Sequence, residues 1–255
     1  MNETTSITLR AYGSLRDLLP SSASGSDFLN HSFSRKASIK DVIESLGIPH
    51  TEIADLIVNG GSQTFDYIVK DSDRIEIQPF TPPVDVRQAT FLRPQPLVFI
   101  RFIVDVNVGK LASLLRLAGF DTSYQNHWRD EELARVAAQE RRILLTRDRA
   151  LLKRKSIIFG HLVREIEPHA QLAEIIAYYG LANEALPFSR CLRCNTTLIP
   201  VDKNAILHRL KPLTRKYYNV FHRCPDCGKI YWLGSHRDNM ETYLRIINGT
   251  AQPNP

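Results

Sequence analysis

Short apolar runs along the first 80 residues predict a small mixed domain. Strands are expected at residues 7–12, 56–59 and 74–78. Residues 38–46 repeat apolar side chains at helical spacing, and Ser38 stands where an N-cap belongs. Gly60-Gly61 directly follows an apolar run, which favours a hairpin. Strands and one helix mixed in this way over about 80 residues predict a small α+β domain.

Extended and helical patterns then alternate between residues 97 and 187. Strands are expected at residues 98–104, 120–124, 142–146 and 156–159, and helices at residues 109–118, 130–140 and 168–179. Such alternation predicts a parallel sheet with right-handed crossovers. Open sheets of this kind bind ligands beyond the carboxyl ends of their strands.

Four prolines between residues 82 and 96 interrupt these patterns, and proline both suppresses strand pairing and stiffens a connection. We therefore expect a domain at residues 1–82, a linker at 83–96, a second domain at 97–187, a cysteine-containing module at 188–248 and a flexible tail at 249–255.

Charge is distributed unevenly over these segments. Residues 1–82 carry 7 Lys/Arg against 11 Asp/Glu, whereas residues 188–255 carry 11 against 4. A basic body suggests a polyanionic partner, although general solubility would also account for it. The sequence contains no apolar run of membrane-spanning length and no secretory signal. Because there is no such apolar run, we expect no contact with a membrane. Because the cysteines are confined to two pairs, we expect a protein of the reducing cytoplasm.

Acidic residues recur where the expected strands of the second domain end. Asp105 and Asp148 follow apolar runs, Asp121 lies near another, and Asp130 and Glu131 open the intervening helix. Carboxylates that leave neighbouring parallel strands at one edge would repel one another unless a cation neutralised them. Oxygen ligands favour Mg²⁺ or Mn²⁺, which can activate water for attack on a phosphodiester. The alternative is that these acids cap helices and turns.

Basic residues accompany the acids. Lys110, Arg147 and Arg149 lie within a few residues of Asp105 or Asp148, and such side chains can hold phosphate oxygens. We therefore expect a site in which acids bind metal and cations bind substrate.

Cys191-Leu-Arg-Cys194 and Cys224-Pro-Asp-Cys227 form two knuckles separated by 29 residues. Four thiolates suit tetrahedral Zn²⁺ in a structural site, and a strand pair can fill the interval. A disulfide pair or a redox dithiol is the alternative.

Basic and aromatic residues surround the knuckles, and we expect Arg215, Lys216 and Arg223 to contact RNA phosphates. The aromatic side chains suit either a small core or base stacking.

Two resemblances refine these expectations. LIVNG followed by KDSDRIEI resembles the ubiquitin-like sulfur carriers, which implies a β-grasp fold for residues 1–82. Those carriers act through a free C-terminal Gly-Gly, whereas this chain continues beyond Gly60-Gly61. The resemblance therefore implies a docking or structural role for the head.

The stretches VDVNVGKLASLLRLAGFDT and RDEELARVAAQERRILLTRDRALL resemble the Mut-seven C-terminal RNase family. This implies a multidomain α/β protein with a ubiquitin-like head, a PIN-like nuclease domain and a zinc ribbon. By position, Asp105, Asp130 and Asp148 match the family's catalytic acids. A fourth acid has no counterpart after Asp148, so one metal ion or two stays open.

The expected function is a ribonuclease that requires Mg²⁺ or Mn²⁺ and acts on RNA, with tRNA and other structured RNAs among the candidates. The head would bind a protein partner. Two alternatives stay open: an RNA-binding protein without turnover, and a sulfur-carrier-like or partner-docking protein.

Overall fold

The computed structural model describes residues 4–20 and 28–232. The chain divides into two compact units, one of residues 1–99 and 129–162 and the other of residues 100–128 and 163–255. The expected tail at 249–255 and the end of the expected cysteine module, residues 233–248, lie outside the described residues. The units divide the chain differently from the expected domains because residues 129–162 pack with the N-terminal part.

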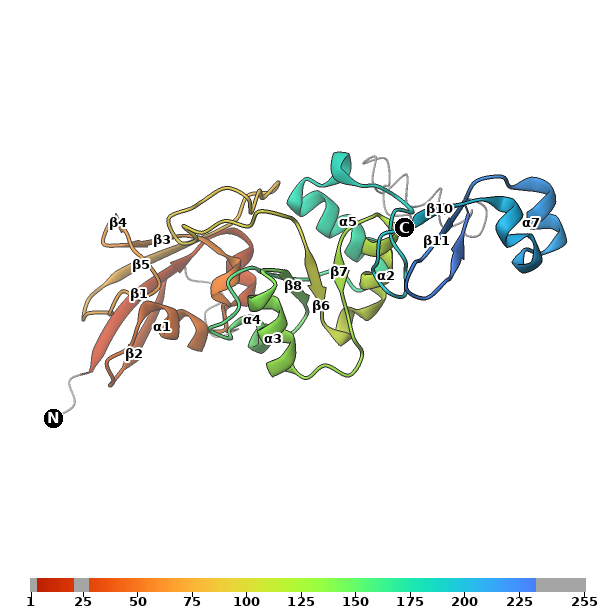
Figure 1. Cartoon of the computed structure of the whole chain (residues 1–255). Helices are drawn as coiled ribbons and strands as arrows, with labels where there is room; N and C mark the ends of the chain where they lie inside the picture. Colours follow the sequence, from red (N-terminus) through yellow and green to blue (C-terminus); the bar gives the residue numbers. More distant parts are fainter. Residues whose placement is uncertain (1–3, 21–27, 233–255) are drawn as a thin grey trace. The chain divides into compact units, whose positions relative to one another are not determined.

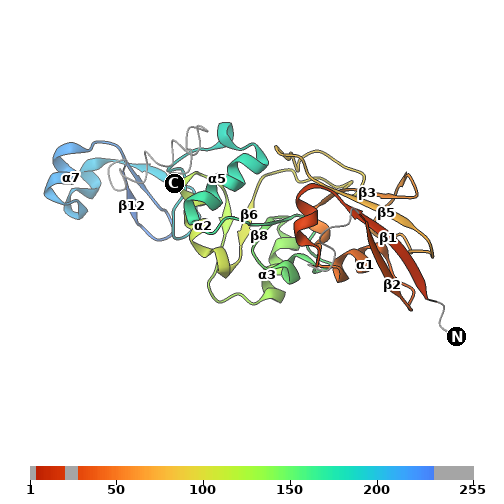
Figure 2. The ribbon, with the colours of Figure 1, turned by 180° about the vertical axis from the view of Figure 1, so that it is seen from behind.

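The first unit begins with a five-stranded sheet in the order β2-β1-β5-β3-β4 (Figures 1 and 2). Its strands are β1 (Thr5–Ala11), β2 (Leu29–Phe33), β3 (Ile53–Val58), β4 (Gly61–Ser62) and β5 (Arg74–Pro79). Strands β1 and β5 are parallel, and the other pairs are antiparallel. This is the β-grasp arrangement, and it confirms the fold expected for the head.

Helix α1 (Ile39–Ser45), which lies between β2 and β3 in the chain, buries Ile39, Val42 and Ile43. The hydroxyl of Ser38 accepts a hydrogen bond from the Asp41 backbone N–H at 3.2 Å, so the expected N-cap is present. The head also contains the 3₁₀ helices η1 (Gly13–Leu18) and η3 (His50–Glu52).

The hairpin that joins β3 to β4 turns through Asn59 and Gly60, which have φ angles of 51° and 83°. Two consecutive positive φ values define a type I′ turn, which suits the twist of paired strands. Gly61 lies in β4, where it pairs with Val58. The Gly-Gly pair is thus part of a sheet.

The remainder of the first unit consists of α3 (Asp130–Gln139), β8 (Ile143–Thr146), α4 (Arg149–Leu152) and β9 (Gly160–Leu162). Strands β8 and β9 are parallel. The expected strand at 156–159 is wrong, because pairing with β8 begins at Gly160 and residues 156–159 form the approach to β9.

Polar contacts join this part of the first unit to the head. The imidazole of His50 lies 2.7 Å from the Ile157 carbonyl, and the buried Glu52 carboxylate accepts from the Leu162 N–H at 2.9 Å. The Lys153 ammonium donates to the Glu44 carbonyl at 2.7 Å. The head is therefore packed against β9 and the segment that precedes it.

Arg93 occupies the interval that the prolines marked as a linker. Only 6% of it is exposed, and its guanidinium lies 4.8 Å from the centre of the Phe80 ring. Its nitrogens donate to the backbone carbonyls of His50, Thr51, Ile53 and Ile158 at 2.8–3.3 Å. The interval thus has a buried anchor as well as exposed prolines.

The second unit contains β6 (Phe102–Val104), the 3₁₀ helix η4 (Val106–Val108), α2 (Gly109–Leu117), β7 (Thr122–Ser123), α5 (Pro168–Tyr179) and η5 (Ala182–Glu184). Strands β6 and β7 are parallel. Parallel pairs in both units confirm the expected central parallel α/β fold. Strand β6 is shorter than the expected 98–104, because Val98 and Phe99 are 73% and 64% exposed.

The cysteine module completes the second unit. It contains β10 (Ile199–Val201), α6 (Lys203–Ile206), η6 (Leu207–Arg209), α7 (Pro212–Tyr217), β11 (Phe221–Arg223) and β12 (Ile230–Tyr231). The strands form an antiparallel sheet in the order β10-β11-β12. A strand pair does join the two knuckles, as expected, and short helices lie between its two strands.

Within the described residues, every helix is too short or too polar to cross a lipid bilayer.

Candidate functional site

Asp105 directly follows β6 and is only 9% exposed. One carboxylate oxygen accepts from the Val106 N–H, and the other accepts from the Asn107 side-chain amide, both at 2.6 Å. Asp105 therefore caps η4, as the alternative interpretation expected. The same bonds fix a buried carboxylate beyond the end of a parallel strand, which is where ligands bind in sheets of this class.

Asp148 lies two residues after β8 in the first unit and is half-buried. It is the N-cap of α4, where Oδ1 accepts from the N–H groups of Ala150 at 2.7 Å and Leu151 at 3.4 Å. The backbone N–H of Asp148 donates to the Thr146 hydroxyl at 2.9 Å. Because both capping bonds fall on Oδ1, Oδ2 is the oxygen that a cation would take.

Asp130 and Glu131 open α3, as expected, and both are exposed. The Arg154 guanidinium lies 2.8 Å from Glu131 and 3.7 Å from Asp130. Its hydrogen bond lowers the pKa of Glu131. Glu131 thus forms an ion pair with Arg154.

Asp121 and Asp105 lie at opposite ends of the β6–β7 strand pair. Asp121 precedes β7, and the register pairs Phe102 with Thr122, so Asp121 stands at the amino end of the strand pair and Asp105 beyond its carboxyl end. Four residues of strand separate the two levels by about 13 Å. The Asn195 amide donates to the Asp121 carboxylate at 2.8 Å. Asp121 thus contacts the cysteine module, and metal binding by Asp121 stays a prediction.

The candidate acids are divided between the two units. Among residues 4–20 and 28–232, only the four cysteines bring three or more His, Cys, Asp or Glu ligand atoms within 4.8 Å of one another. Asp105 belongs to the second unit, and Asp130 and Asp148 belong to the first. Metal binding by these acids remains a prediction.

The expected phosphate-binding cations have different surroundings. Lys110 is exposed in the first turn of α2, and Arg147 is exposed between β8 and Asp148. Arg149 is exposed, but its guanidinium donates to the Leu18 carbonyl of the head at 3.0 Å. Arg149 thus has a structural contact that the sequence did not reveal.

The sulfurs of Cys191, Cys194, Cys224 and Cys227 all lie within 4.8 Å of one another. The two knuckles have the same backbone geometry. Asn195 and Gly228, which follow the second cysteine of each knuckle, have φ angles of 67° and 69°. Their N–H groups donate to the carbonyls of Cys191 and Cys224, at 2.9 and 3.0 Å. The donor set fits one tetrahedral Zn²⁺.

The thiols also show why a cation suits this site. Burial raises the pKa of Cys191, but hydrogen bonds from the Tyr231 hydroxyl and from the Cys194 and Arg193 N–H groups outweigh burial and lower it to about 6. Burial and the neighbouring sulfurs raise the pKa of Cys194 to about 12. One ionised thiol therefore makes ionisation of its neighbour less favourable, and a bound cation would remove that electrostatic cost.

The first knuckle is fixed to the rest of the second unit. The guanidinium of Arg116, which is 6% exposed, donates to the carbonyls of Leu192 and Arg193 at 2.9 and 3.0 Å. The Arg190 guanidinium donates to the Gly119 carbonyl at 3.0 Å.

The three cations expected to contact RNA from this module, Arg215, Lys216 and Arg223, are all exposed. Nε of Arg215 donates to the Leu210 carbonyl at 2.9 Å, which orients the guanidinium.

Several residues of these sites were not expected from the sequence. Asn107 binds Asp105, Arg154 binds Asp130 and Glu131, and Tyr231 lies 3.1 Å from the Cys191 sulfur. Only Asn107 left a local signal, because it lies two residues after its partner. The others meet their partners across 23 residues or more, a distance over which local pattern gives no information.

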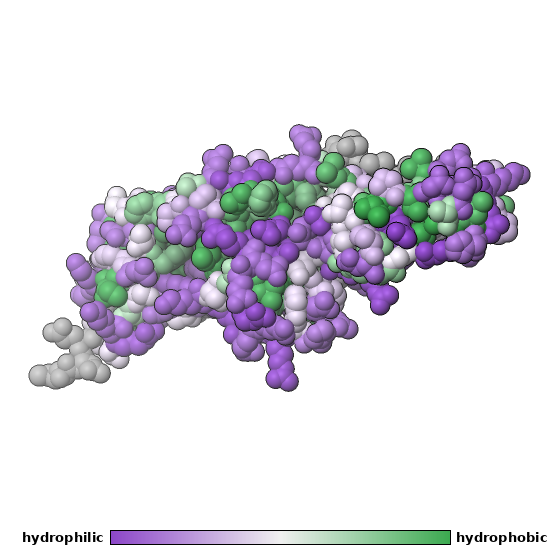
Figure 3. Space-filling model, viewed as in Figure 1, coloured by the Kyte–Doolittle hydropathy of each residue, from purple (hydrophilic) through white to green (hydrophobic). Residues whose placement is uncertain are grey.

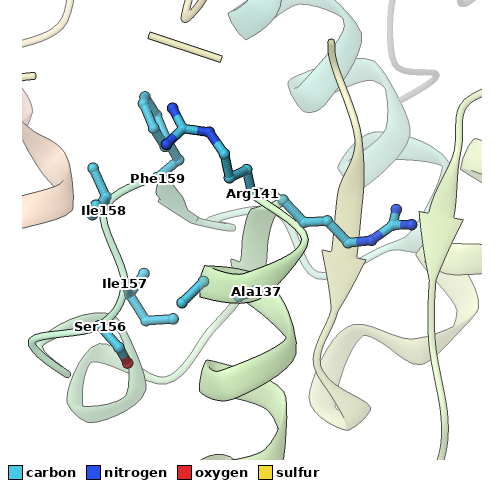
Figure 4. Close-up of a pocket in the computed structure, with 8 residues that line it drawn as sticks. Ala137, Arg141, Ser156, Ile157, Ile158 and Phe159 are labelled. Carbon is cyan, nitrogen blue, oxygen red and sulfur yellow. The ribbon is translucent and has the colours of Figure 1, made fainter. Parts of the chain in front are cut away.

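A small cavity lies between the end of α3 and the loop before β9 (Figure 4). It is lined by Ala137, Ala138, Arg141, Arg142, Ser156, Ile157, Ile158 and Phe159. Its volume is about 50 Å³. Ligand pockets commonly measure about 300–1,000 Å³, so this one is too small for a drug-sized ligand.

Comparisons with known proteins agree with this architecture. The family model described as the Mut7-C RNAse domain matches residues 100–244, and the one described as Mut7-C ubiquitin matches residues 4–85. A search of curated proteins gave no match.

Two solved structures resemble part of the chain. The crystal structure of SAMP1 from Haloferax volcanii is 14% identical, covers 30% of this chain and 97% of its own, and has a TM-score of 0.25. The putative molybdopterin converting factor, subunit 1, from Pyrococcus furiosus is 19% identical, with coverage of 29% and 97% and a TM-score of 0.24.

The RNAse-domain model covers more than half of the 255 residues, and the ubiquitin model covers the β-grasp sheet that precedes it. The chain therefore belongs to the Mut7-C RNAse domain family and carries the Mut7-C ubiquitin domain at its N-terminal side.

Proposed function

We propose that this protein is a ribonuclease that cleaves RNA phosphodiester bonds with the help of Mg²⁺ or Mn²⁺. The observation that carries the proposal is the match of residues 100–244 to an RNase domain. The positions of Asp105 and Asp148 support it, because each follows the carboxyl end of a parallel strand and is oriented by hydrogen bonds.

The proposed division of labour follows from the donor atoms. Asp105, Asp130 and Asp148 would hold the metal through carboxylate oxygens, which hard cations prefer. A divalent ion in such a site lowers the pKa of water and polarises a phosphoryl oxygen. Lys110 and Arg147 would hold phosphate oxygens of the substrate, and the positive charge of residues 188–255 would attract the RNA.

The four cysteines would hold one structural zinc ion, since with all four bound no coordination position is left for a substrate. The head would serve as a structural and docking domain, because it packs against β9 and its Gly60-Gly61 pair lies in a hairpin.

The test is cleavage of a mixed structured RNA by the purified chain with Mg²⁺, with Mn²⁺ and without divalent metal. We expect cleavage only with metal. Asp148→Asn should lower the cleavage rate at least 100-fold while RNA affinity stays within about twofold, because asparagine retains the cap but is a poor metal ligand. Asp66→Asn, an exposed change in the head, is the matched control. Equal cleavage by Asp148→Asn would exclude this site.

A second candidate is an RNA-binding protein without turnover. It is favoured by the partners that these acids already have: Asp105 accepts hydrogen bonds from Val106 and Asn107, and Arg154 lies 3.7 Å from Asp130. Metal-independent RNA binding together with no cleavage under any metal would support it.

A further inference from the structure

The interval between the two knuckles is strongly basic. Its 29 residues carry one acid, Asp202, and six cations, which are Lys203, Arg209, Lys211, Arg215, Lys216 and Arg223. The Asp202 carboxylate caps α6, because it accepts a hydrogen bond from the Asn204 N–H at 2.7 Å. This interval therefore has the charge of a surface that meets a polyanion.

The structure separates the aromatic residues of this module into two groups. Phe221 and Tyr231 are only 2% and 4% exposed, and Tyr218 and Trp232 pack against the core around Phe221. Tyr217 differs from all of these, because it is 64% exposed. Its ring is thus available to a ligand, while the others form the core of the module.

Helix α7 produces this separation by its periodicity. Thr214 is buried and Tyr218 packs inward, whereas Leu213 and Tyr217, also four residues apart, are 70% and 64% exposed. Residues four apart share one face of a helix. The outward face of α7 therefore presents an aromatic ring and an aliphatic side chain together.

Cations border this face. Lys216 is exposed, and its ammonium lies 5.3 Å from the centre of the Tyr217 ring. Lys211, also exposed, immediately precedes the helix. Figures 1 and 2 show α7 at the outer end of its module, and in Figure 3 hydrophobic residues lie among hydrophilic ones at this end.

We propose that the outward face of α7 binds single-stranded RNA, with Tyr217 stacking against an unpaired base and Lys211 and Lys216 contacting the flanking phosphates. An exposed ring amid cations is the combination that binds single strands. Duplex RNA fits less well, because its bases are already stacked within the helix. An apolar protein surface would match Leu213 and Tyr217 but not the surrounding positive charge. The choice of RNA as the ligand rests on the proposed function.

The test measures binding of a fluorescent oligouridylate of about twelve nucleotides to the full chain, without added divalent metal. A duplex of equal length is the second probe. Tyr217→Ala should weaken binding of the single strand about 5- to 150-fold, which corresponds to the loss of one stacked base. Tyr217→Phe keeps the ring and should bind within about twofold of the wild type. Zinc content and circular dichroism should be unchanged, because the side chain is exposed.

A second measurement addresses the phosphates. Lys216→Gln should make the slope of log affinity against log salt shallower by about 0.7, the value for one phosphate contact on a single strand. Equal single-strand binding by wild type and Tyr217→Ala would overturn the proposal, as would equal weakening by Tyr217→Phe. A wild type that binds the strand through Tyr217 but cleaves no RNA with Mg²⁺ or Mn²⁺ would refute the nuclease and leave this site intact. Metal-dependent cleavage by a protein whose RNA binding does not depend on Tyr217 would support the nuclease and refute this binding site.

Discussion

Arg93 provides the sharpest test of how the first unit is held together. Its buried guanidinium donates to four backbone carbonyls, three in the head and one, Ile158, in the segment before β9. Arg93→Ala removes every one of these bonds, although the His50 carbonyl keeps a second donor, the Ile53 backbone N–H. The proline-rich sequence around Arg93 indicates only a linker, so a large effect of this substitution would come from tertiary contacts.

The magnitude follows from the contacts. A hydrogen bond that involves a charged group contributes about 1.5–3 kcal/mol, and bonds that share one donor group are not additive. Counting two of the four gives a loss of about 3–6 kcal/mol in the free energy of unfolding. For a unit of this size, the melting temperature should fall by about 11–21 °C.

The assay is thermal unfolding of the full chain together with amide hydrogen exchange, which assigns the loss to one unit. Exchange should accelerate at Leu162 and in β3 (Ile53–Val58). The matched control is Arg87→Ala in the same interval, where an exposed guanidinium pairs with Asp85 at 2.8 Å. An exposed pair contributes at most about 1 kcal/mol. If both variants lost the same stability, the reasoning would be refuted.

Three further predictions concern zinc, pH and backbone conformation. Replacing Cys224 and Cys227 by serine should abolish zinc binding, measured by atomic absorption, and unprotect the module in hydrogen exchange, because the ion contributes its folding energy. Burial lowers the pKa of His50, so its contribution to stability is present above the unfolded value near 6.5 and is lost as pH falls below it. Urea unfolding at pH 7 and pH 5 should show that loss, and His50→Gln should reduce it. Gly119→Ala should cost about 2–4 kcal/mol, because φ is +98° and the new Cβ would lie 2.3 Å from the Leu186 carbonyl oxygen.

Each of these has a result that would contradict it. Full zinc content in the double serine variant would exclude the four-sulfur site. A pH dependence that His50→Gln leaves unchanged would assign the effect to another group. Wild-type stability of Gly119→Ala would mean that the loop at Leu186 is free to move.

The sequence by itself determined the elements whose signals are local. Spacing within a few residues predicted three features that the structure contains. They are helix α1 with its Ser38 cap, the hairpin at Gly60-Gly61 and the paired cysteine knuckles. These features need no information about distant residues.

Tertiary structure decided the features that depend on which distant groups meet. Strand register, which local pattern does not encode, places Asp121 before β7 (Thr122–Ser123), at the other end of the strand pair from Asp105. Arg149 contacts Leu18 across 131 residues, and Arg93 is buried among carbonyls that the proline-rich sequence around it does not indicate. Tyr217 is distinguished from Tyr218 only by the orientation of a short helix against its core. Burial and pairing are properties of the folded chain, because they arise from desolvation and contact between segments that the sequence keeps apart.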